Sequence, residues 1–333
     1  MSKTICGPAI LVAGGAGYIG AHTCKALAAA GYLPVTLDNL VMGHAAAVKW
    51  GPFHQGDIRD AALVKALVEQ YAIQGAIHFA AHSLVGESTR DPAKYYDNNV
   101  AAGTVFVQAL VEAGVRSLVF SSTAAVYGAP TVSPIPEDQP ADPINPYGGS
   151  KLAFEGVLRW MGEAHGLGWT VLRYFNAAGA DPDGEIGESH EPETHLIPLL
   201  CKAVLGSAPP LTVFGRDYDT PDGTPIRDYV HVADLADAHV LALARLLDGG
   251  GDLTLNVGAG EGATVLQLIA AAEAVLGRPV PHVFGPRRAG DPLSLVADTR
   301  RIRAELGWSP KRSDLPTMVG DAYRWLEKQA RGS

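Results

Sequence analysis

The chain has 333 residues, of which 47% are apolar, and it contains 38 glycines and 23 prolines. This composition suits a compact α/β protein with many tight loops and excludes a disordered chain. The formal net charge of −9 argues against a nucleic-acid or anionic-membrane partner, although a local basic pocket could still bind a phosphorylated ligand.

Neither a membrane span nor a signal peptide is evident in the sequence. No apolar run approaches the roughly 20 residues that a span needs, and residues 1–8 are short and polar, so we expect a cytoplasmic protein. Cys6, Cys24 and Cys201 are odd in number and lack the spacing of metal ligands. We therefore expect free thiols in a reducing compartment and no metal site.

Strands and helices alternate along the first half of the chain. Short apolar runs predict strands at 9–13, 33–37, 75–79, 117–121 and 169–174. Longer segments between them predict helices at 22–30, 61–71, 100–113 and 151–165. This alternation predicts an α/β fold with a doubly wound parallel sheet, the Rossmann arrangement.

The pattern changes after Asn176. Polar loops at 181–192 and 216–225, rich in Gly and Pro, are long for a compact domain, which favours a functional role. A helix at 232–247 and a strand at 253–257 follow them. We expect a sheet domain and a second, smaller domain that closes over it, divided as residues 1–176 with about 227–258, and residues 177–226 with 259–333.

Gly14, Gly17 and Gly20 lie between the first predicted strand and the first predicted helix. Glycines at these positions let the backbone approach a pyrophosphate, and the N-terminus of the helix offers N–H groups to phosphates. Asp38 ends the second strand, where a carboxylate meets ribose hydroxyls and disfavours a 2′-phosphate; on its own it would also suit a loop cap. Asp57 follows a further strand and is expected near the adenine. These features predict an NAD site.

Tyr147 and Lys151 are four residues apart, so a helix places them on one face. An ammonium close to a phenol lowers the pKa of the phenol and makes it a usable base near neutral pH. Pro143 and Pro146 predict a fixed loop that delivers Tyr147 to a cleft. The pair alone would also fit an ordinary helix surface.

Ser121, Ser122 and Thr123 end the fourth predicted strand. Ligands of open α/β sheets bind outside the carboxyl ends of the strands, so a hydroxyl there can hold a sugar oxygen while Tyr147 moves its proton. In isolation the three residues would be a polar strand end. Their order along the chain, after the glycine turn and before Tyr147, favours a catalytic site.

With these residues, the chain resembles the extended short-chain dehydrogenases and, within them, the UDP-glucose 4-epimerases. The resemblance covers nearly the whole chain, and the wording THLIPL and DYDTPDGT looks most like bacterial epimerases that feed exopolysaccharide synthesis. It rests on the segments GGAGYIG, LDNL, GDIRD, HFAAHSLVGES, YYDNNV, FSSTAAVYG, NPYGGSK, RYFNAAGA, HLIPL, FGRDYDTPDGTPIRDYVHVADLADAH and RRAGD.

The resemblance implies a hydride shuttle at C4 of a UDP-hexose. Tyr147 takes the proton of the sugar 4-hydroxyl, NAD takes the C4 hydride, and the 4-keto sugar rotates before the hydride returns to its opposite face. Thr123 holds the 4-oxygen, and Lys151 binds the nicotinamide ribose and tunes Tyr147. NAD stays bound and ends each cycle oxidised, and the second domain is the one that binds substrate.

The resemblance also assigns the remaining site residues. Around NAD it places Gly14, Gly17, Tyr18, Ile19, Gly20, Asp38, Asn39, Asp57, Ile58, Phe79, Ala80, Ala81, Ser83, Asn98, Ser121, Tyr147, Lys151 and Phe175. Around the UDP-sugar it places Thr123, Tyr147, Asn176, His195, Leu196, Val213, Phe214, Arg227, Tyr229, Arg288, Asp291 and Leu295.

The chemistry of the substrate set agrees in part. Arg227 and Arg288 supply forked donors for a pyrophosphate, and Phe214 or Tyr229 could lie against the uracil. Each Arg would also suit a solvated surface, with Asp228 and Asp291 as ion-pair partners.

Three positions depart from the family pattern. Ser83 replaces a common Lys, His195 replaces a common Asn, and Met42-Gly43 replaces Asn-Ser. We expect these departures to affect cofactor affinity more than the chemistry.

Related activities are separated by single features of the sequence. A dehydratase of this family needs a Glu directly after Thr123, where this chain has Ala124, so we exclude that activity. A UDP-pentose or UDP-glucuronate 4-epimerase shares the chemistry and is the nearest alternative. A non-catalytic NAD sensor would have no use for Tyr147 and Lys151. The family often forms homodimers, so a homodimer is possible here.

Overall fold

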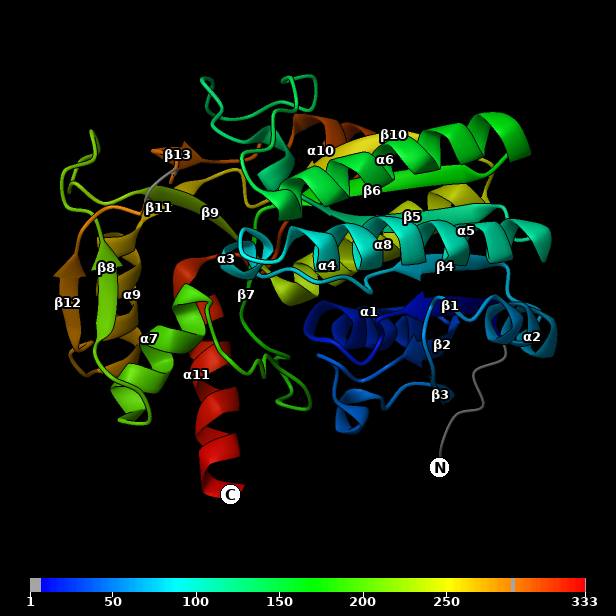
Figure 1. Ribbon diagram of the computed structural model, residues 1–333. Coiled ribbons are helices and arrows are strands. Elements are labelled where there is room, and N and C mark those ends of the chain that lie inside the picture. The colour runs from blue at the N-terminus through cyan, green and yellow to red at the C-terminus, as the bar shows by residue number, and fades with distance from the viewer. Residues whose placement is uncertain (1–6, 289–290, 333) are drawn as a thin grey trace.

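The computed structural model describes residues 7–288 and 291–332 of the chain. Cys6, Ala289 and Gly290 lie outside these ranges. A seven-stranded parallel sheet dominates the molecule (Figure 1), in the order β10-β6-β5-β4-β1-β2-β3. Its strands are β1 (Ala9–Ala13), β2 (Leu33–Asp38), β3 (Phe53–Gln55), β4 (Gly75–His78), β5 (Ser117–Thr123), β6 (Gly168–Tyr174) and β10 (Leu253–Val257).

Both faces of this sheet are apolar, as a doubly wound sheet requires. In β1, Leu11 and the alanines on either side of it pack toward one helix layer, while Ile10 and Val12 pack toward the other. The first layer holds α2 (Ala61–Tyr71), α5 (Gly103–Glu112) and α6 (Pro146–His165), and the second holds α1 (Tyr18–Ala29), α8 (Val232–Leu247) and α10 (Arg300–Leu306). The predicted α/β fold with a doubly wound parallel sheet is confirmed.

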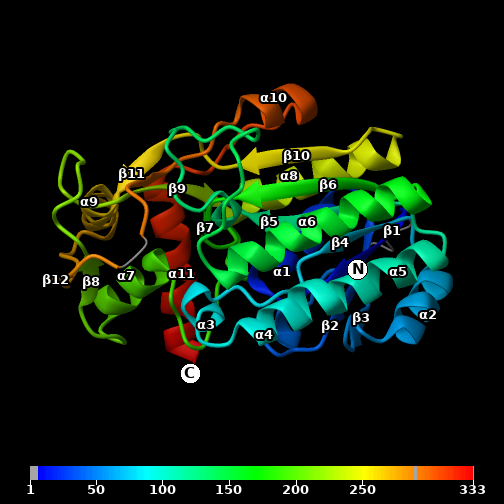
Figure 2. The same ribbon diagram turned by 45° about the horizontal axis from the view of Figure 1, so that its top comes forward.

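A smaller group of elements lies beside the sheet, at the carboxyl ends of its strands (Figures 1 and 2). One small sheet contains β7 (Asn176–Ala178), β9 (Ile226–His231), β11 (Gly262–Thr264) and β13 (Ser294–Leu295), and another pairs β8 (Leu211–Phe214) with β12 (His282–Gly285). A third core joins β7, β8, β9 and β11 to α7 (Leu196–Leu205), α9 (Val265–Leu276) and α11 (Leu315–Gly332). The chain therefore leaves the large sheet after β6 and returns to it with α8 and β10.

Several helices begin at residues other than those expected. Helix α6 begins at Pro146, five residues before the prediction, because the Asn145 side chain accepts a hydrogen bond from Gly148 N at 2.9 Å and caps it. Helix α1 begins at Tyr18 rather than residue 22, since its first turn contains Gly20. The helix expected from residue 100 is a π-helical segment, Asp97–Ala102, that continues into α5.

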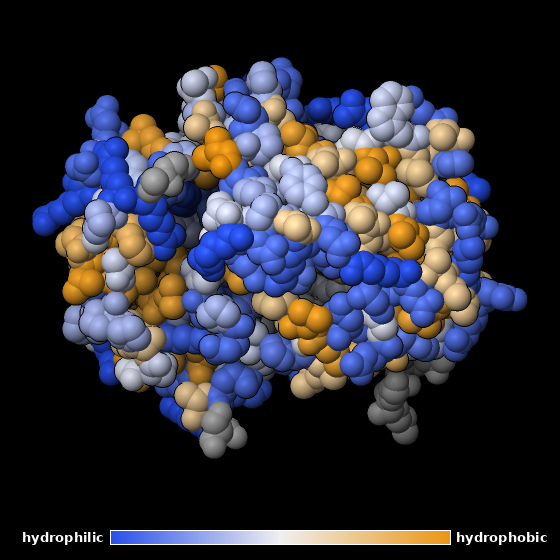
Figure 3. Space-filling model, in the orientation of Figure 1, coloured by the Kyte–Doolittle hydropathy of each residue, from blue (hydrophilic) through white to orange (hydrophobic). Residues whose placement is uncertain are grey.

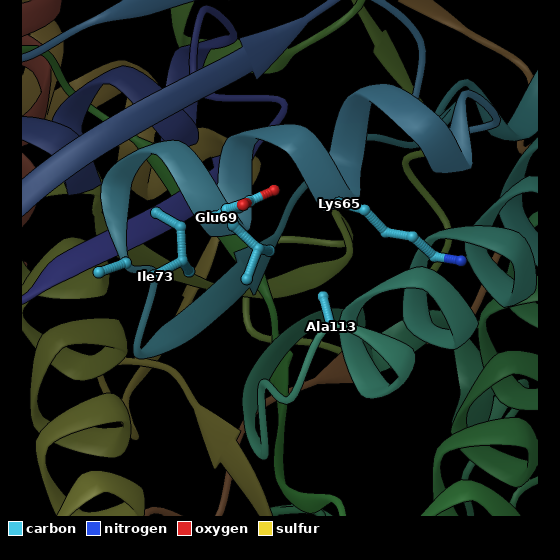
Figure 4. A pocket seen from close by; sticks show the side chains of 6 residues that line it. Lys65, Glu69, Ile73 and Ala113 are labelled. Carbon is cyan, nitrogen blue, oxygen red and sulfur yellow. The ribbon is translucent and has the colours of Figure 1, made fainter.

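Two further observations bound the search for a site. None of the helices in the described ranges is both long and apolar enough to cross a membrane. An open pocket lies between α2 and the end of α5 (Figure 4), lined by Lys65, Val68, Glu69, Ala72, Ile73 and Ala113. Ile73 and Ala113 lie in the segments that lead into β4 and β5, so this pocket lies at the amino ends of the strands, the edge opposite to the expected site.

Candidate active site

The carboxyl ends of the parallel strands bring most of the predicted residues together. Strand order reverses beside β1, whose neighbours β2 and β4 come from successive halves of the sheet. A crevice for a ligand forms at such a switch point. Gly14 follows β1, Asp38 ends β2, Phe79 follows β4 and Thr123 ends β5.

The three glycines of the first turn have different physical roles. Gly14 has φ of +82°, and a Cβ there would lie 2.6 Å from Ala80 N; a Cβ at Gly20 would lie 2.1 Å from Gly14 O. Packing within the protein therefore requires both of them. A Cβ at Gly17 would meet only Gly14 O, at 3.4 Å, and Gly17 begins α1 without a side-chain cap. The backbone at Gly17 and the first N–H groups of α1 thus fit a pyrophosphate.

Asp38 is held rigidly at the end of β2. Its two carboxylate oxygens accept hydrogen bonds from Ala16 N at 3.0 Å and from Leu40 N at 2.9 Å. Burial raises the pKa of Asp38, and these two bonds oppose the rise. Asn39 donates to Asp57 Oδ2 at 3.1 Å, so the expected ribose and adenine residues lie together. The side chain of Ile58 packs in the core, which leaves only its backbone for a cofactor.

The loop after β4 completes this side of the crevice. Phe79, Ala80 and Ala81 are half-buried there, while Ser83 is exposed. The loop is fixed by Asn99, which the sequence analysis missed. Its side chain accepts from His82 N at 2.9 Å and donates to His82 O and Ser150 Oγ, both at 3.0 Å. The predicted residue beside it, Asn98, is half-buried and donates to Asn99.

Tyr147, Lys151 and Thr123 meet at the end of β5, as the sequence predicts. Tyr147 lies in the first turn of α6 and hydrogen-bonds with Thr123. Lys151 lies one turn further and is 3% exposed; its Nζ donates to Ser121 O at 2.8 Å and lies 4.8 Å from the centroid of the Phe120 ring. The Ser121 hydroxyl is hydrogen-bonded to that of Tyr174.

The expected lowering of the Tyr147 pKa is wrong for the protein by itself. Burial raises the pKa of Tyr147, and the hydrogen bond with Thr123 only partly opposes the rise. Burial also lowers the pKa of Lys151 to about 7, although the charge of Glu155 opposes this change. The ammonium is directed at a carbonyl oxygen and not at the phenol, so a usable base needs a further positive charge.

A buried polar network, which was not expected from the sequence, anchors helix α6. Glu155, two turns beyond Tyr147, accepts from Ser122 Oγ at 2.6 Å and from Arg173 Nη2 at 2.6 Å. Arg173 also donates to the Tyr127 hydroxyl at 3.1 Å, and that hydroxyl donates to Asn256 Oδ1 at 2.7 Å. The spacing of residues 147, 151 and 155 was the available sequence signal.

Two of the expected substrate residues are arginines that already have partners. Arg227 forms an ion pair with Asp291, as one interpretation of the sequence expected. The Arg288 guanidinium lies 4.0 Å from the centroid of the Phe214 ring, so it covers the face that was expected to meet a uracil. Tyr229 is 6% exposed and packs in the third core. Figure 3 shows strongly hydrophilic side chains gathered over this part of the molecule.

The suggestion that Asp228 is an ion-pair partner of the arginines is wrong. Its carboxylate is fully buried and accepts three backbone hydrogen bonds, from Ala259 N, Gly260 N and Ala297 N, at 2.7 to 3.0 Å. Burial raises the pKa of Asp228 to about 6 against these bonds. Asp228 therefore joins β9 to the loop after β10 and to the segment after β13.

The other expected substrate residues lie around this core. Asn176 pairs with Tyr229 across β7 and β9, and its side chain donates to Asp228 O at 2.9 Å. Val213 is buried in β8 and packs in the third core. Leu295 lies opposite Arg227 in the β13–β9 register and packs against the cluster that contains Ala124 and Phe175.

His195 lies at the start of α7, beside the expected substrate residues. It precedes that helix, and Leu196 begins it, with its side chain against the third core. Burial alone lowers the pKa of His195, but its hydrogen bond to Glu188 overcomes this effect and raises it.

Comparison with known proteins shows the family of the chain. The model of the NAD dependent epimerase/dehydratase family matches residues 10–258, which is more than half of the chain. The chain belongs to this family. An epimerase of Lacticaseibacillus casei, a UDP-glucose 4-epimerase, is 48% identical over 97% of this chain and 98% of its own.

Two solved epimerases have the same fold over their whole length. UDP-glucose 4-epimerase from Brucella ovis, in complex with NAD, is 48% identical with a TM-score of 0.94, covering 96% of this chain and 98% of its own. UDP-glucose-4-epimerase from Stenotrophomonas maltophila, with bound NAD and formylated UDP-arabinopyranose, is 40% identical with a TM-score of 0.95, covering 98% and 100%.

Proposed function

We propose that the chain is an NAD-dependent 4-epimerase that interconverts UDP-glucose and UDP-galactose. The observation that carries the proposal is the meeting of Tyr147, Thr123 and Lys151 at the carboxyl end of β5. The crevice beside it contains the uncapped N-terminus of α1 and the carboxylate of Asp38. The activity and the NAD of the full-length relatives agree with this chemistry.

The residues around the reacting carbon have separate tasks in this mechanism. Thr123 holds the sugar 4-oxygen within reach of Tyr147, and Tyr147 takes the 4-hydroxyl proton and later returns it to the 4-oxygen. Bound NAD supplies the acceptor and donor for the C4 hydride, and its oxidised form supplies positive charge. Lys151 lies one turn beyond Tyr147, and in its protonated form it would add positive charge that favours the phenolate of Tyr147.

The second half of the molecule would hold the rest of the nucleotide-sugar. We propose that residues 177–226 and 259–333 form this substrate domain, and that residues 1–176 with about 227–258 bind NAD. Arg227, now paired with Asp291, and Arg288, now stacked on Phe214, would then donate to the pyrophosphate. The Phe214 ring would contact the base. An arginine with a partner already in place is preoriented, which lowers the entropy that binding costs.

A second candidate is a UDP-pentose 4-epimerase. The Stenotrophomonas structure, which has a UDP-arabinopyranose derivative bound, favours it. A dehydratase stays excluded, because buried Ala124 follows Thr123 and no carboxylic acid is available there. To separate the candidates, the protein is incubated with UDP-galactose, UDP-arabinose or UDP-glucuronate, and the products are resolved. We expect the largest kcat/KM for UDP-galactose, and a larger value for either other sugar would overturn the hexose assignment.

We further propose that the enzyme is a cytoplasmic homodimer. Cys24 and Cys201 are buried free thiols, as a reducing compartment favours.

The candidate dimer surface lies on the helix layer that contains α5 and α6. Val105 of α5 and Trp160 of α6 expose 38% and 66% of their surface, and several apolar side chains reach the surface over these helices (Figure 3). Exposed apolar patches mark interfaces. Light scattering should give twice the monomer mass, and Trp160→Glu should return it to the monomer mass.

A further inference from the structure

Four potential metal ligands lie together in the segment between β7 and α7. Glu188, His190, Glu193 and His195 each place one donor atom within 4.8 Å of the other three. From cysteine spacing alone, no metal site was expected in the chain. The two imidazoles and two carboxylates come from one stretch of eight residues, Glu188 to His195, and the fold brings them to one point.

The donor atoms are spaced as ligands of one ion would be. Glu188 Oε1 lies 3.0 Å from His190 Nδ1 and is also in hydrogen-bond contact with His195 Nδ1. Glu193 Oε1 lies 3.6 Å from His195 Nδ1. Tetrahedral ligands at roughly 2.0–2.1 Å from a zinc ion stand about 3.4 Å from one another. Little movement would therefore place an ion among them.

Glu188 supplies an independent observation. Its side chain is 4% exposed, and its second oxygen, Oε2, is buried without a hydrogen-bond partner in the described part of the protein. A buried carboxylate oxygen without a partner is costly, and such groups in native proteins require an explanation. A cation that Glu188 binds through both carboxylate oxygens would supply the missing partner.

The neighbouring acidic group shows what a filled site looks like. Asp181, Asp183 and Glu185 also lie within reach of one another, but the ammonium of Lys25 stands among them at 2.7 to 2.8 Å. Within the described ranges, Glu188 and Glu193 have only histidines as ion-pair partners. An external cation would therefore take the place that Lys25 takes in the first group.

We propose that Glu188, His190, Glu193 and His195 bind one divalent transition-metal ion of the zinc class. Imidazole with carboxylate is a donor set that suits zinc, and the half-exposed His195 side chain leaves a path for entry. The segment is already anchored by Trp325 Nε1, which donates to Glu188 O at 3.0 Å, and by the contact of His44 Nε2 with Ser189 O at 2.8 Å. The His190 ring meets the Tyr18 ring, so the ion fixes this segment beside the start of α1.

The test is a cobalt titration of the wild-type protein after chelator treatment. Tetrahedral Co²⁺ absorbs visible light strongly, whereas hydrated octahedral Co²⁺ absorbs it only weakly and at shorter wavelength. We expect one equivalent to saturate these bands and Zn²⁺ to displace it. His190→Gln and His195→Gln should weaken binding by more than the roughly 10–100-fold that loss of an outer-shell partner causes. His165→Gln, an exposed histidine at the end of α6, should bind as the wild type does.

The absence of a saturable band, or an unchanged affinity in His190→Gln, would overturn the proposal. Amide exchange of the wild type decides the matter even if a variant fails to fold. Zn²⁺ should slow exchange of peptides that span residues 187–196 by at least about tenfold and leave peptides of α2 unchanged. If these peptides exchange equally with and without Zn²⁺, the ion does not bind at this segment and the proposal is overturned. These readouts do not depend on epimerase activity, so they separate this inference from the proposed function.

Discussion

Glu155 of α6 and Arg173 of β6 form a buried ion pair on the helix that carries Tyr147 and Lys151, with Oε2 and Nη2 2.6 Å apart. Both side chains are about nine-tenths buried. The pair fixes the helix that carries Tyr147 and Lys151 to the strand beside β5. Its strength determines how firmly Tyr147 is held beside Thr123 and Lys151 beside Ser121.

Removal of one partner of the Glu155–Arg173 pair should strongly destabilise the folded protein. Glu155→Gln leaves Arg173 charged and buried, which should lower the free energy of unfolding by about 3–5 kcal/mol in urea titrations. Glu163→Gln, on the exposed side of the same helix, should change it by less than about 0.5 kcal/mol. Similar losses for both variants would contradict the role of the pair.

Tyr147→Phe should lower kcat by roughly 10²–10⁴-fold, the usual contribution of general acid–base catalysis, with little change in substrate affinity. Tyr95→Phe is the matched control. That phenol lies edge-on to Tyr147 at 6.4 Å and bonds to Leu84 O and Glu87, so its removal should reduce stability and spare turnover. Near-normal turnover by Tyr147→Phe would refute the mechanism.

Lys151 should make the stability of the NAD-free protein depend on pH. Burial lowers its folded pKa to about 7, whereas an unfolded Lys titrates near 10.4, so the unfolded chain binds more protons between these values. The loss of folding stability that the buried ammonium causes is complete below about pH 7. It disappears as pH rises toward about 10.4, where the unfolded chain also loses the proton. Lys151→Met should therefore stabilise the protein at pH 7, by up to about 4 kcal/mol, while abolishing activity. A parallel pH profile of unfolding in both proteins would contradict this assignment.

The purified protein should carry NAD(H) and epimerise the UDP-sugar without added cofactor, because the hydride that NAD takes from C4 returns to the sugar in each cycle. Acid release followed by an enzymatic assay measures the bound nucleotide. Asp38→Ser should reduce the preference for NAD over NADP, since the carboxylate that disfavours a 2′-phosphate is lost. Full dependence of the wild type on added NADP would refute the role of Asp38.

Leu295 should set tolerance for N-acetylated sugars. It packs beside Ala124 and Phe175, and extra volume in a packed site costs about 1–3 kcal/mol, or roughly 10–200-fold in kcat/KM. We expect weak activity on UDP-N-acetylglucosamine, higher in Leu295→Cys and lower in Leu295→Tyr. Val296→Ala, whose side chain packs toward Gly262, should leave the ratio unchanged. Equal efficiency on acetylated and plain sugars in the wild type would show that Leu295 is no gate.

Local patterns predicted the elements of the large sheet well. The bounds of β1, α2, α8 and β10 agree with the sequence prediction, since each element is an uninterrupted apolar or amphipathic run. The start of α6 was missed because Gly148 and Gly149 obscured a helix that Asn145 and Pro146 begin. The π-helical turn that presents Asn99 has no local signature, because its partners lie 17 and 51 residues away.

The residue types at the site were predicted from the sequence, but their protonation behaviour was not. The glycine motif and the Tyr–Lys spacing placed the right groups together, because strand ends meet at one edge of a parallel sheet. Burial then raised the pKa of Tyr147, and burial depends on the whole fold. Asp228 shows the same limit: nothing in its neighbours along the chain indicates that three distant N–H groups will surround it.

The order of strands in the large sheet has a consequence for synthesis of the chain. Strand β6 pairs with β10, which leaves the ribosome roughly 80 residues later. At a synthesis rate of about 5–20 residues per second, β6 remains an open edge for several seconds. An open strand edge can pair with another chain. Slow elongation between residues 174 and 257 should therefore promote aggregation of the nascent protein, and chains that stop before β10 should be the most prone to it.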